Sequence, residues 1–523
     1  MQTPKDEILK ALKKLVGQEN ILVERTRNSS FGDYTTNIAL ILSKKNGKSP
    51  LEVANDLVQK LHEEKIEGVD KIESAGGFIN FRLSEDFLQK QVLEIIKLAE
   101  DYGSSDIGKQ KKVRVEFISA NPTGPLHIGN ARGGPIGDVL SNVLGKTGYK
   151  VTREYLNNDV GGQVKQLGQT IYYTLNPDKK PEEELSYQGD YIKELSVKVA
   201  KIVKNGSADK LGKVAVEILF KEIMEDVKKM GIKFDLIRYE SDLRKKVPQA
   251  LKTIQKVLKK KDGALWFAPS DEFLKDRETV VQKSDGDYTY FASDIAYHKE
   301  KFEDADKVFD VLGGNHSAHV PRLQAAVKAM GFDVSKFKVI LYQYVRIKSG
   351  DLAVKMSKRL GKFITAREVL DEVGKDAFRF FLLTSGPDTH MDFDLELAKK
   401  RANENPVYYV QYAYSRIHGI FKKQSDFINP NVSLLKEKEE IELIRHLIKL
   451  PELLEEISEN FSVHFLTSYS LELANLFHKF YEVHQVVSND KEKTKARLAL
   501  LSATKVVLKN TLDLLGVEAP ERM

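Results

Sequence analysis

The chain of 523 residues contains no cysteine. This absence excludes disulfides, thiol catalysis and zinc or iron–sulfur sites built on thiolates, and it fits a cytosolic protein. Long apolar runs are also missing, because none approaches the ~18 residues that a membrane helix needs. The amino-terminal segment lacks the basic-then-apolar layout of a secretory signal and reads as an amphipathic helix. We therefore expect a cytoplasmic protein that has no membrane partner.

An excess of one charge is nearly absent as well. The 82 basic residues are balanced by 76 acidic ones, which leaves a net charge of +6. A weak basic excess is more often a solvated surface than a nucleic-acid interface, so total charge does not decide between them. The hydrophobic content of 41% is enough to form buried hydrophobic cores. A chain of this length predicts about two to four domains.

The first part of the chain, 1–108, mixes helical and strand-like patterns. A helix is expected to begin at Pro50, because Ser49 precedes it as a helix cap. Alternation of apolar and polar residues over 78–84 predicts a half-buried strand. A polar, glycine-bearing break at 103–112 marks a boundary. We therefore expect an α+β domain over 1–108.

The second part, 109–394, has the pattern of a parallel sheet. The β-branched run "VRVEFI" (113–118) leads into a glycine-rich segment, an amphipathic helix and a second strand at 149–156. The helix face consists of Ile136, Val139, Leu140, Val143 and Leu144. This strand–loop–helix–strand order is the βαβ unit of an α/β Rossmann-type domain.

Further strands are predicted at 307–314 and 338–347, with a helix between them. The region 165–262 looks mainly helical and is interpreted as an insertion in the sheet domain. From 395 to 523 strand signals vanish. Leucines at 501, 508, 512 and 515 mark a buried helix stripe, and Gly516 is a plausible cap. We therefore expect an all-α carboxy-terminal bundle.

The junction after the first parallel strand reads "PLHIGN" (125–130). It fits neither the phosphate-binding loop pattern nor the dinucleotide fingerprint. It does place the imidazole of His127, the bare backbone of Gly129 and the amide of Asn130 where a helix begins, and helix N-termini attract phosphate. The alternative is a loop histidine that merely caps the helix.

A second basic motif, "LAVKMSKRLGKF", spans 352–363. Taken alone, it could be a solvated charged loop. Lysines beside glycine also stabilise the charge that develops in phosphoryl or nucleotidyl transfer. Neither motif decides alone, but the two in this order on a parallel-sheet domain favour nucleotide chemistry.

The two motifs resemble the HIGH and KMSKS signatures of class I aminoacyl-tRNA synthetases. The surrounding sequence is similar to the arginyl-tRNA synthetase family from residue 31 to Met523. The segments that carry this resemblance are "FGDYTTNIAL", "VEFISANPTGPLHIGNARGG", "REYLNNDVGGQ", "YQGDYI", "YFASDIAYH", "NPVYYVQYAYSRI" and "APERM".

The resemblance implies an ATP-dependent arginine–tRNA ligase. L-arginine would be activated to arginyl-adenylate and then transferred to the 3′-terminal ribose of tRNA(Arg). Mg²⁺ would accompany ATP, coordinated by phosphate and water, with no metal site made by the protein. The family further implies a cytoplasmic monomer whose nucleic-acid partner is tRNA and not DNA.

By the same resemblance, residues of both motifs would contact ATP: His127, Gly129, Asn130, Gly313, Lys355, Met356, Ser357 and Lys358. The sequence departs from the family's first signature at Asn130, where the motif has histidine. Asparagine can donate a hydrogen bond but cannot carry charge.

A second set would bind arginine: Glu116, Ser119, Asn121, Glu240, Tyr290, Asp294 and His316. Two carboxylates and a tyrosine suit a planar, always charged guanidinium. Taken singly, Glu240 and Asp294 could equally be surface or helix-end acids. His316 and His319 could be read as a metal pair, but the sequence offers no evident third ligand.

The tRNA contacts implied by the resemblance are Phe78 and Asn80 for the elbow, and Tyr412, Arg416 and Met523 for the anticodon. The alternative for Phe78 is a core position in its strand, and tyrosine at helical spacing is usually core.

Three rival functions remain at the level of sequence. A class I synthetase for another amino acid would not need Glu240 and Asp294. A small nucleotidyltransferase would not need the helical tail. A catalytically inactive tRNA-binding relative would be expected to lose His127, Lys355 and Lys358.

Overall fold

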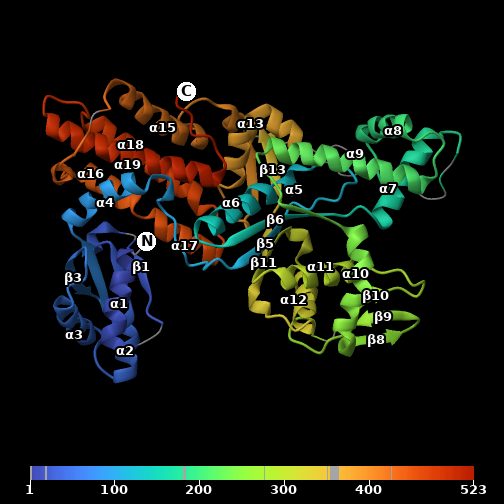
Figure 1. Cartoon of the computed structure of the whole chain (residues 1–523), viewed down its shortest axis with the longest axis horizontal. Helices are drawn as coiled ribbons and strands as arrows, with labels where there is room; N and C mark the ends of the chain where they lie inside the picture. Colours follow the sequence, from blue (N-terminus) through green and yellow to red (C-terminus); the bar gives the residue numbers. More distant parts are fainter. Residues whose placement is uncertain are drawn as a thin grey trace.

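The computed structural model describes residues 3–17, 20–26, 28–179, 181, 184–275, 277–349, 352–353, 364–425 and 427–523. An amino-terminal domain, a central domain and a helical carboxy-terminal domain follow one another along the chain (Figure 1). This order of α+β, α/β and all-α parts confirms the predicted fold class. Within the described ranges, no helix has the length and apolarity required to cross a membrane.

The amino-terminal domain is an antiparallel sheet covered by helices. Its strand order is β1-β2-β4-β3. The strands are β1 (Val23–Arg25), β2 (Tyr34–Thr36), β3 (Val69–Ala75) and β4 (Phe78–Leu83), and the helices are α1 (Pro4–Val16), α2 (Ile38–Asn46) and α3 (Pro50–Glu63). The Ser49 N–H donates to Glu52 Oε2 at 3.2 Å, and α3 begins at Pro50 as predicted. The next helix, α4 (Glu85–Leu98), packs on helices of the carboxy-terminal domain.

The central domain is built on a five-stranded sheet, in which every neighbouring pair is parallel. The strand order is β12-β11-β5-β6-β7. Its strands are β5 (Lys112–Phe117), β6 (Lys150–Asn157), β7 (Leu236–Tyr239), β11 (Lys307–Gly313) and β12 (Phe337–Tyr342). Its main helices are α5 (Ile128–Ala131), α6 (Gly133–Lys146), α11 (Tyr290–Asp304) and α12 (Val320–Ala329). The predicted apolar face of α6 is buried, which confirms the βαβ unit.

The region 165–262 is more varied than the predicted helical insertion. Its first part does form a helical cluster of α7 (Gly162–Leu175), α8 (Asp190–Ile202) and α9 (Ala208–Lys229). Strand β7 then returns to the central sheet, so this region is not a single insertion. The rest comprises α10 (Glu240–Thr253) and an antiparallel sheet of β8 (Leu258–Lys261), β9 (Ala264–Phe267) and β10 (Thr279–Gln282).

The predicted single strand at 338–347 is wrong, because the chain forms two strands there. After β12, the N–H of Gln343 donates to Pro387 O at 2.8 Å, and the chain leaves the central sheet. It continues as β13 (Val345–Ser349), which pairs with β14 (Leu352–Ala353) and, in parallel, with β15 (Met391–Asp394). An apolar sequence run alone does not reveal where a strand changes sheets.

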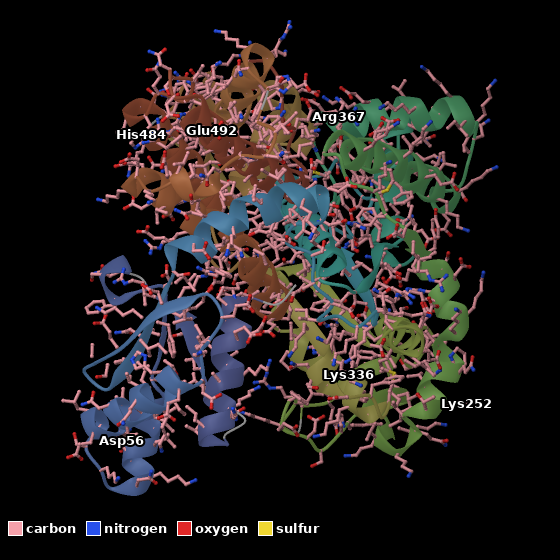
Figure 2. All side chains as sticks on the ribbon, turned by 60° about the vertical axis from the view of Figure 1, so that its left-hand side comes forward. Asp56, Lys252, Lys336, Arg367, His484 and Glu492 are labelled. Carbon is pink, nitrogen blue, oxygen red and sulfur yellow. The ribbon has the colours of Figure 1, made fainter. Side chains whose placement is uncertain are left out.

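After β15, the described residues of the carboxy-terminal domain form helices and their connections and contain no strand. Its helices, with the connecting α13, are α13 (Ala366–Leu382), α14 (Leu395–Lys399), α15 (Pro406–Lys423), α16 (Lys438–Leu447), α17 (Leu450–Asn460), α18 (Phe465–Val483) and α19 (Lys491–Leu515). Gly516 has φ +67° and caps α19, as predicted. Figure 2 labels Asp56 on the amino-terminal domain and Glu492 on α19 among the side chains of the surface.

Helix α6 lies close to the central sheet because Gly137 faces Phe117 of β5. A methyl group at Gly137 would overlap the Phe117 ring, and that ring is fully buried. We expect Gly137→Ala to lower the free energy of unfolding by ~1–3 kcal/mol, the usual cost of overpacking. Urea denaturation measures this change.

Gly145 provides the control on the same helix, because a methyl group there would meet nothing within 4 Å. We expect Gly145→Ala to be neutral or to stabilise by up to ~1 kcal/mol. Equal effects of the two substitutions would contradict the proposed packing constraint.

Candidate active site

A cavity of about 890 Å³ opens at the carboxyl ends of β5 and β11. The strand order reverses between these two neighbours, because the chain runs outward from β5 to β6 and β7 and on the other side to β11 and β12. Ligands of open parallel sheets bind at this kind of position. The cavity is therefore the candidate active site.

The turn after β5 is bent by two non-glycine residues with positive φ, Ile118 at +67° and Ser119 at +37°. Such conformations are uncommon outside glycine and persist where neighbouring contacts hold them. Ser119 Oγ accepts from the N–H of Leu156 at 3.0 Å, and Asn121 Nδ2 donates to Gln163 Oε1 at 2.8 Å. Ser119 and Asn121 both line the cavity, fixed from the neighbouring strand and helix.

His127 caps α5 and also lines the cavity. Its Nδ1 accepts from the N–H of Gly129 at 2.9 Å, so the neutral ring carries its proton on Nε2. His127 can therefore cap α5 through Nδ1 and still donate a hydrogen bond from Nε2 to a bound molecule. Asn130 lines the cavity as well, and Gly313 lies at its rim where β11 ends.

The four residues of the second signature lie outside the described residues: Lys355, Met356, Ser357 and Lys358. The hairpin of β13 and β14 ends at Ala353, two positions before Lys355 in the sequence.

Of the candidate arginine-binding residues, Tyr290 and Asp294 line the cavity from α11, and His316 lines it from the segment after β11. Asp294 Oδ2 lies 2.9 Å from His319 Nε2, so one of the two candidate metal-binding histidines is paired with a carboxylate. In the described ranges, no group of three His, Cys, Asp or Glu side chains could hold a metal ion.

Glu240 lies behind this wall and is 1% exposed. Its Oε1 accepts from Arg244 Nη2 at 3.0 Å and from Ser293 Oγ at 3.4 Å. Its Oε2 has no hydrogen-bond partner among the described residues. Burial raises the pKa of Glu240, Arg244 opposes the increase, and the nearby Asp294 adds to it.

The sequence analysis missed a buried ion cluster beneath the cavity. Lys301 of α11 is fully buried, and its Nζ contacts Glu116 Oε2 on β5 and Asp310 Oδ1 on β11 at 2.5 and 2.7 Å. His298 Nε2 lies 2.8 Å from Asp310 Oδ2. The signal was present, because Ile295, His298 and Lys301 follow one another at helical spacing on one buried face.

The pKa values in this cluster follow from the competition between burial and pairing. Burial alone would lower the pKa of Lys301, but Asp310 and Glu116 raise it above its usual range. Burial would raise the pKa of Asp310, but Lys301 and His298 hold it well below its usual range. Burial raises the pKa of Glu116 despite Lys301. Lys301 and Asp310 therefore form the main ion pair.

The candidate tRNA contacts lie on two other surfaces. Phe78 is 41% exposed, so the core alternative is wrong for it, whereas Asn80 beside it is buried. Tyr412, Arg416 and Met523 together line a cavity of about 1000 Å³ in the carboxy-terminal domain, which His484 also lines. Figure 2 labels His484 on this domain.

Arg416 organises the aromatic side chains of this second cavity. Its guanidinium carbon lies 4.3 Å from the centre of the Tyr481 ring, and its Nη1 donates to the Tyr412 hydroxyl at 3.1 Å. Stacked rings and a cation beside them are suited to unpaired bases.

Comparison with known proteins identifies the class of this fold. Residues 91–383 match the model "tRNA synthetases class I (R), catalytic domain". The methionyl-tRNA synthetase of Mycobacterium tuberculosis, 12% identical, covers 77% of this chain and 91% of its own with a TM-score of 0.56, and it shares the fold alone. The chain therefore has the fold of a class I aminoacyl-tRNA synthetase.

The flanking regions identify the family. Residues 2–83 match "Arginyl tRNA synthetase N terminal domain", and residues 410–523 match "DALR anticodon binding domain". The arginine–tRNA ligase of Aquifex aeolicus is 38% identical over 99% of both chains. The arginyl-tRNA synthetase of Thermus thermophilus, 22% identical, has the same fold over 99% of both chains with a TM-score of 0.82. The chain belongs to the arginyl-tRNA synthetase family.

The buried cluster predicts a pH-dependent stability defect. In Lys301→Met, Glu116 and Asp310 keep their burial but lose their cation, and breaking a buried pair costs ~3–5 kcal/mol. Protonation of the two acids relieves this cost, so the defect in unfolding free energy should be largest near neutral pH and should shrink as pH falls. Urea denaturation across a pH series measures it.

Lys299→Met on the same helix is the control, because Lys299 pairs with the exposed Glu303. Surface pairs contribute at most ~1 kcal/mol, so this variant should lose little at any pH. A defect in Lys301→Met that does not change with pH would refute the pairing.

Proposed function

We propose that the cavity joins ATP, L-arginine and the 3′ end of tRNA(Arg) in the arginine–tRNA ligase reaction. An oxygen of the arginine carboxylate attacks the α-phosphorus of ATP, and the bond to the leaving pyrophosphate breaks. A hydroxyl of the terminal ribose then attacks the arginyl carbonyl carbon, and AMP leaves. The observation that carries this proposal is that Tyr290 and Asp294 share one cavity with His127 and Asn130.

ATP is assigned to the side of the cavity formed by His127, Asn130 and Gly313. An imidazole N–H and an amide N–H suit phosphate oxygens. Lys355 and Lys358 would stabilise the departing pyrophosphate, with Met356 and Ser357 between them. Because these donors do not suit a cation, Mg²⁺ is assigned to the phosphate oxygens and to water.

Arginine is assigned to the opposite side. The guanidinium would be held by Asp294, Tyr290 and the second oxygen of Glu240, which lacks a partner among the described residues. Glu116, Ser119, Asn121 and His316 would hold the α-amino and carboxylate groups. This arrangement places the attacking carboxylate between the guanidinium pocket and the phosphates, where orientation alone lowers the barrier.

For tRNA, we propose Phe78 and Asn80 as elbow contacts and Tyr412, Arg416 and Met523 as anticodon contacts. The exposure of Phe78 and the shared cavity of the other three residues support this proposal. The monomeric state and the cytoplasmic location remain predictions.

Pyrophosphate exchange into ATP, measured with tRNA present for each of the amino acids, tests the function. We expect exchange with arginine. Exchange with lysine or cysteine but not arginine would refute the specificity, and no exchange with intact tRNA binding would support a protein that only binds tRNA.

The buried carboxylate predicts a pH dependence of arginine binding. A cation binds the ionised form of Glu240, and burial raises the pKa of this group in the free protein. The KM for arginine should therefore rise as pH falls, beginning at a higher pH than an ordinary carboxyl would give. Glu240→Gln should raise the KM by about 30-fold or more at neutral pH and should remove this part of the pH dependence.

Asp242→Asn is the matched control, because Asp242 lies two positions further on the same helix and pairs with Lys245 at the surface. Its KM and pH profile should match those of the wild type. A wild-type pH profile in Glu240→Gln would exclude Glu240 from the guanidinium pocket.

A further inference from the structure

The proposed reaction does not account for Arg244, which follows Glu240 by one turn of α10. Its Nε and Nη2 both donate to the same oxygen, Glu240 Oε1, at 3.1 and 3.0 Å. Glu240 is buried, and its Oε2 has no hydrogen-bond partner among the described residues. Two N–H groups of Arg244 therefore hold one oxygen of the carboxylate and leave the other oxygen to a further donor.

Other arginine–glutamate pairs of the chain use the carboxylate differently. Arg25 donates to both oxygens of Glu452. Arg114 likewise donates to both oxygens of Glu154, from Nε and from Nη2. A forked pair of this kind engages the whole carboxylate. The pair on α10 engages half of it, so it is not a closed ion pair.

The pair of Arg238 and Glu300 shows how this geometry is completed elsewhere in the chain. Arg238 Nε and Nη2 both donate to Glu300 Oε1, as those of Arg244 do to Glu240. The second oxygen, Glu300 Oε2, accepts from Lys246 Nζ at 2.7 Å. This carboxylate thus binds a different cation at each oxygen. For Glu240, the described part of the chain supplies a cation at Oε1 but no donor at Oε2.

Arg244 also lies close to Tyr290, which lines the candidate active site from α11. Helices α10 and α11 pack side by side (Figure 1). Arg244 and Tyr290 together line an adjoining cavity of about 670 Å³. The bare backbone of Gly161 makes room for both, because a methyl group there would lie 2.7 Å from the Tyr290 hydroxyl and 3.3 Å from Arg244 Nη2. Arg244 therefore binds one proposed arginine ligand, Glu240, and is a near neighbour of a second.

Charged groups from three elements act on Glu240. Arg244 lies on α10, Asp294 lies on α11, and Asp159 precedes α7. Burial raises the pKa of Glu240, Arg244 lowers it, and Asp294 and Asp159 raise it. Of these three groups, Arg244 is the one that favours the ionised carboxylate. A substrate guanidinium requires that ionised form for a charge-assisted pair.

We propose that Arg244 is a positioning residue for arginine recognition, which holds Glu240 ionised through Oε1 and so presents Oε2 to the guanidinium of the substrate. This inference rests on the proposed role of Glu240 in binding arginine. It extends that role by naming the group that fixes the carboxylate.

Removal of the Arg244 charge tests the inference through the KM for arginine. In Arg244→Met, Glu240 stays buried but loses its cation, so the KM should rise about tenfold at neutral pH while kcat stays within about twofold. As pH falls, the further rise in KM should begin at a higher pH than in the wild type, because a buried carboxyl without its cation takes up a proton more readily. Pyrophosphate exchange with tRNA present, measured across a pH series, gives these values. A wild-type KM and pH profile would overturn the inference.

Arg244→Lys separates charge from geometry. Its ammonium restores a cation beside Oε1 but lacks the fixed fork of two N–H groups. This variant should return the pH profile toward that of the wild type and leave the KM raised about threefold. Equal KM values and equal pH profiles in Arg244→Met and Arg244→Lys would overturn the inference. If Arg244→Met does not fold, Arg244→Gln, which also lacks the charge, replaces it.

Arg238→Met is the matched control. The side chains of Arg238 and Arg244 are 32% and 30% exposed, and each donates twice to one oxygen of a glutamate. Glu300, the partner of Arg238, lies outside the described lining of the candidate active site and keeps its contact with Lys246. Arg238→Met should therefore leave the KM for arginine and its pH profile unchanged. The same changes in Arg238→Met as in Arg244→Met would overturn the inference.

A double variant separates this inference from the proposed role of Glu240. If Arg244 acts through Glu240, Glu240→Gln combined with Arg244→Met should have a KM no higher than that of Glu240→Gln alone. Multiplied increases would overturn the inference. A wild-type KM in Glu240→Gln would refute the role of Glu240 and, with it, the inference. A raised KM in Glu240→Gln beside a wild-type KM in Arg244→Met would overturn the inference alone.

Discussion

The buried contact of Lys301 with Asp310 and Glu116 is the constraint on which the site depends. Two adjacent parallel strands each place a carboxylate below the point where the sheet opens, and Lys301 spans both. Without that cation, two acids would share a buried space and repel each other. With Lys301 present, the negative charge at the floor of the cavity is compensated. The carboxylates that remain for a substrate cation are those of Glu240 on α10 and Asp294 on α11. The proposed separation of an arginine pocket from a phosphate-binding turn is consistent with this distribution of charge.

A second, partly buried contact sets how the amino-terminal and carboxy-terminal domains sit on each other. Arg25 of the amino-terminal domain donates to both oxygens of Glu452 on α17, at 2.9 and 3.0 Å. The Tyr34 hydroxyl donates to the same carboxylate at 2.5 Å. Forked pairs of this kind fix orientation as well as distance. The surfaces proposed for the tRNA elbow and the anticodon therefore belong to domains that are joined directly, which suits a single extended ligand.

Hydrophobic periodicity and helix-ending residues allowed individual helices to be predicted from the sequence. Helix α6 follows from its apolar face, and the end of α19 follows from Gly516. Periodicity could not show that 338–347 divides between two sheets, because the break depends on contacts of Gln343 with residues far along the chain. Helical spacing placed Lys301 on one face with Ile295 and His298, but its role could not be predicted, because its partners Glu116 and Asp310 lie on β5 and β11. In the site, the resemblance to the family predicted the residues that line the cavity. The structure showed in addition that Glu240 lies behind the wall that Tyr290 and Asp294 form.

Arg132 helps to explain why asparagine, and not histidine, stands at position 130 of the first signature. Asn130 stands two positions before the buried Arg132 guanidinium, which donates to the carbonyls of Gln343, Thr389 and Gly386. A second cation close to such a group is disfavoured, because like charges in a medium of low dielectric constant raise each other's cost. An amide at 130 can donate a hydrogen bond without adding charge, and the backbone carbonyl of Asn130 accepts from the Tyr342 hydroxyl. Asparagine thus suits a turn that must remain neutral while it is attached to a buried cation.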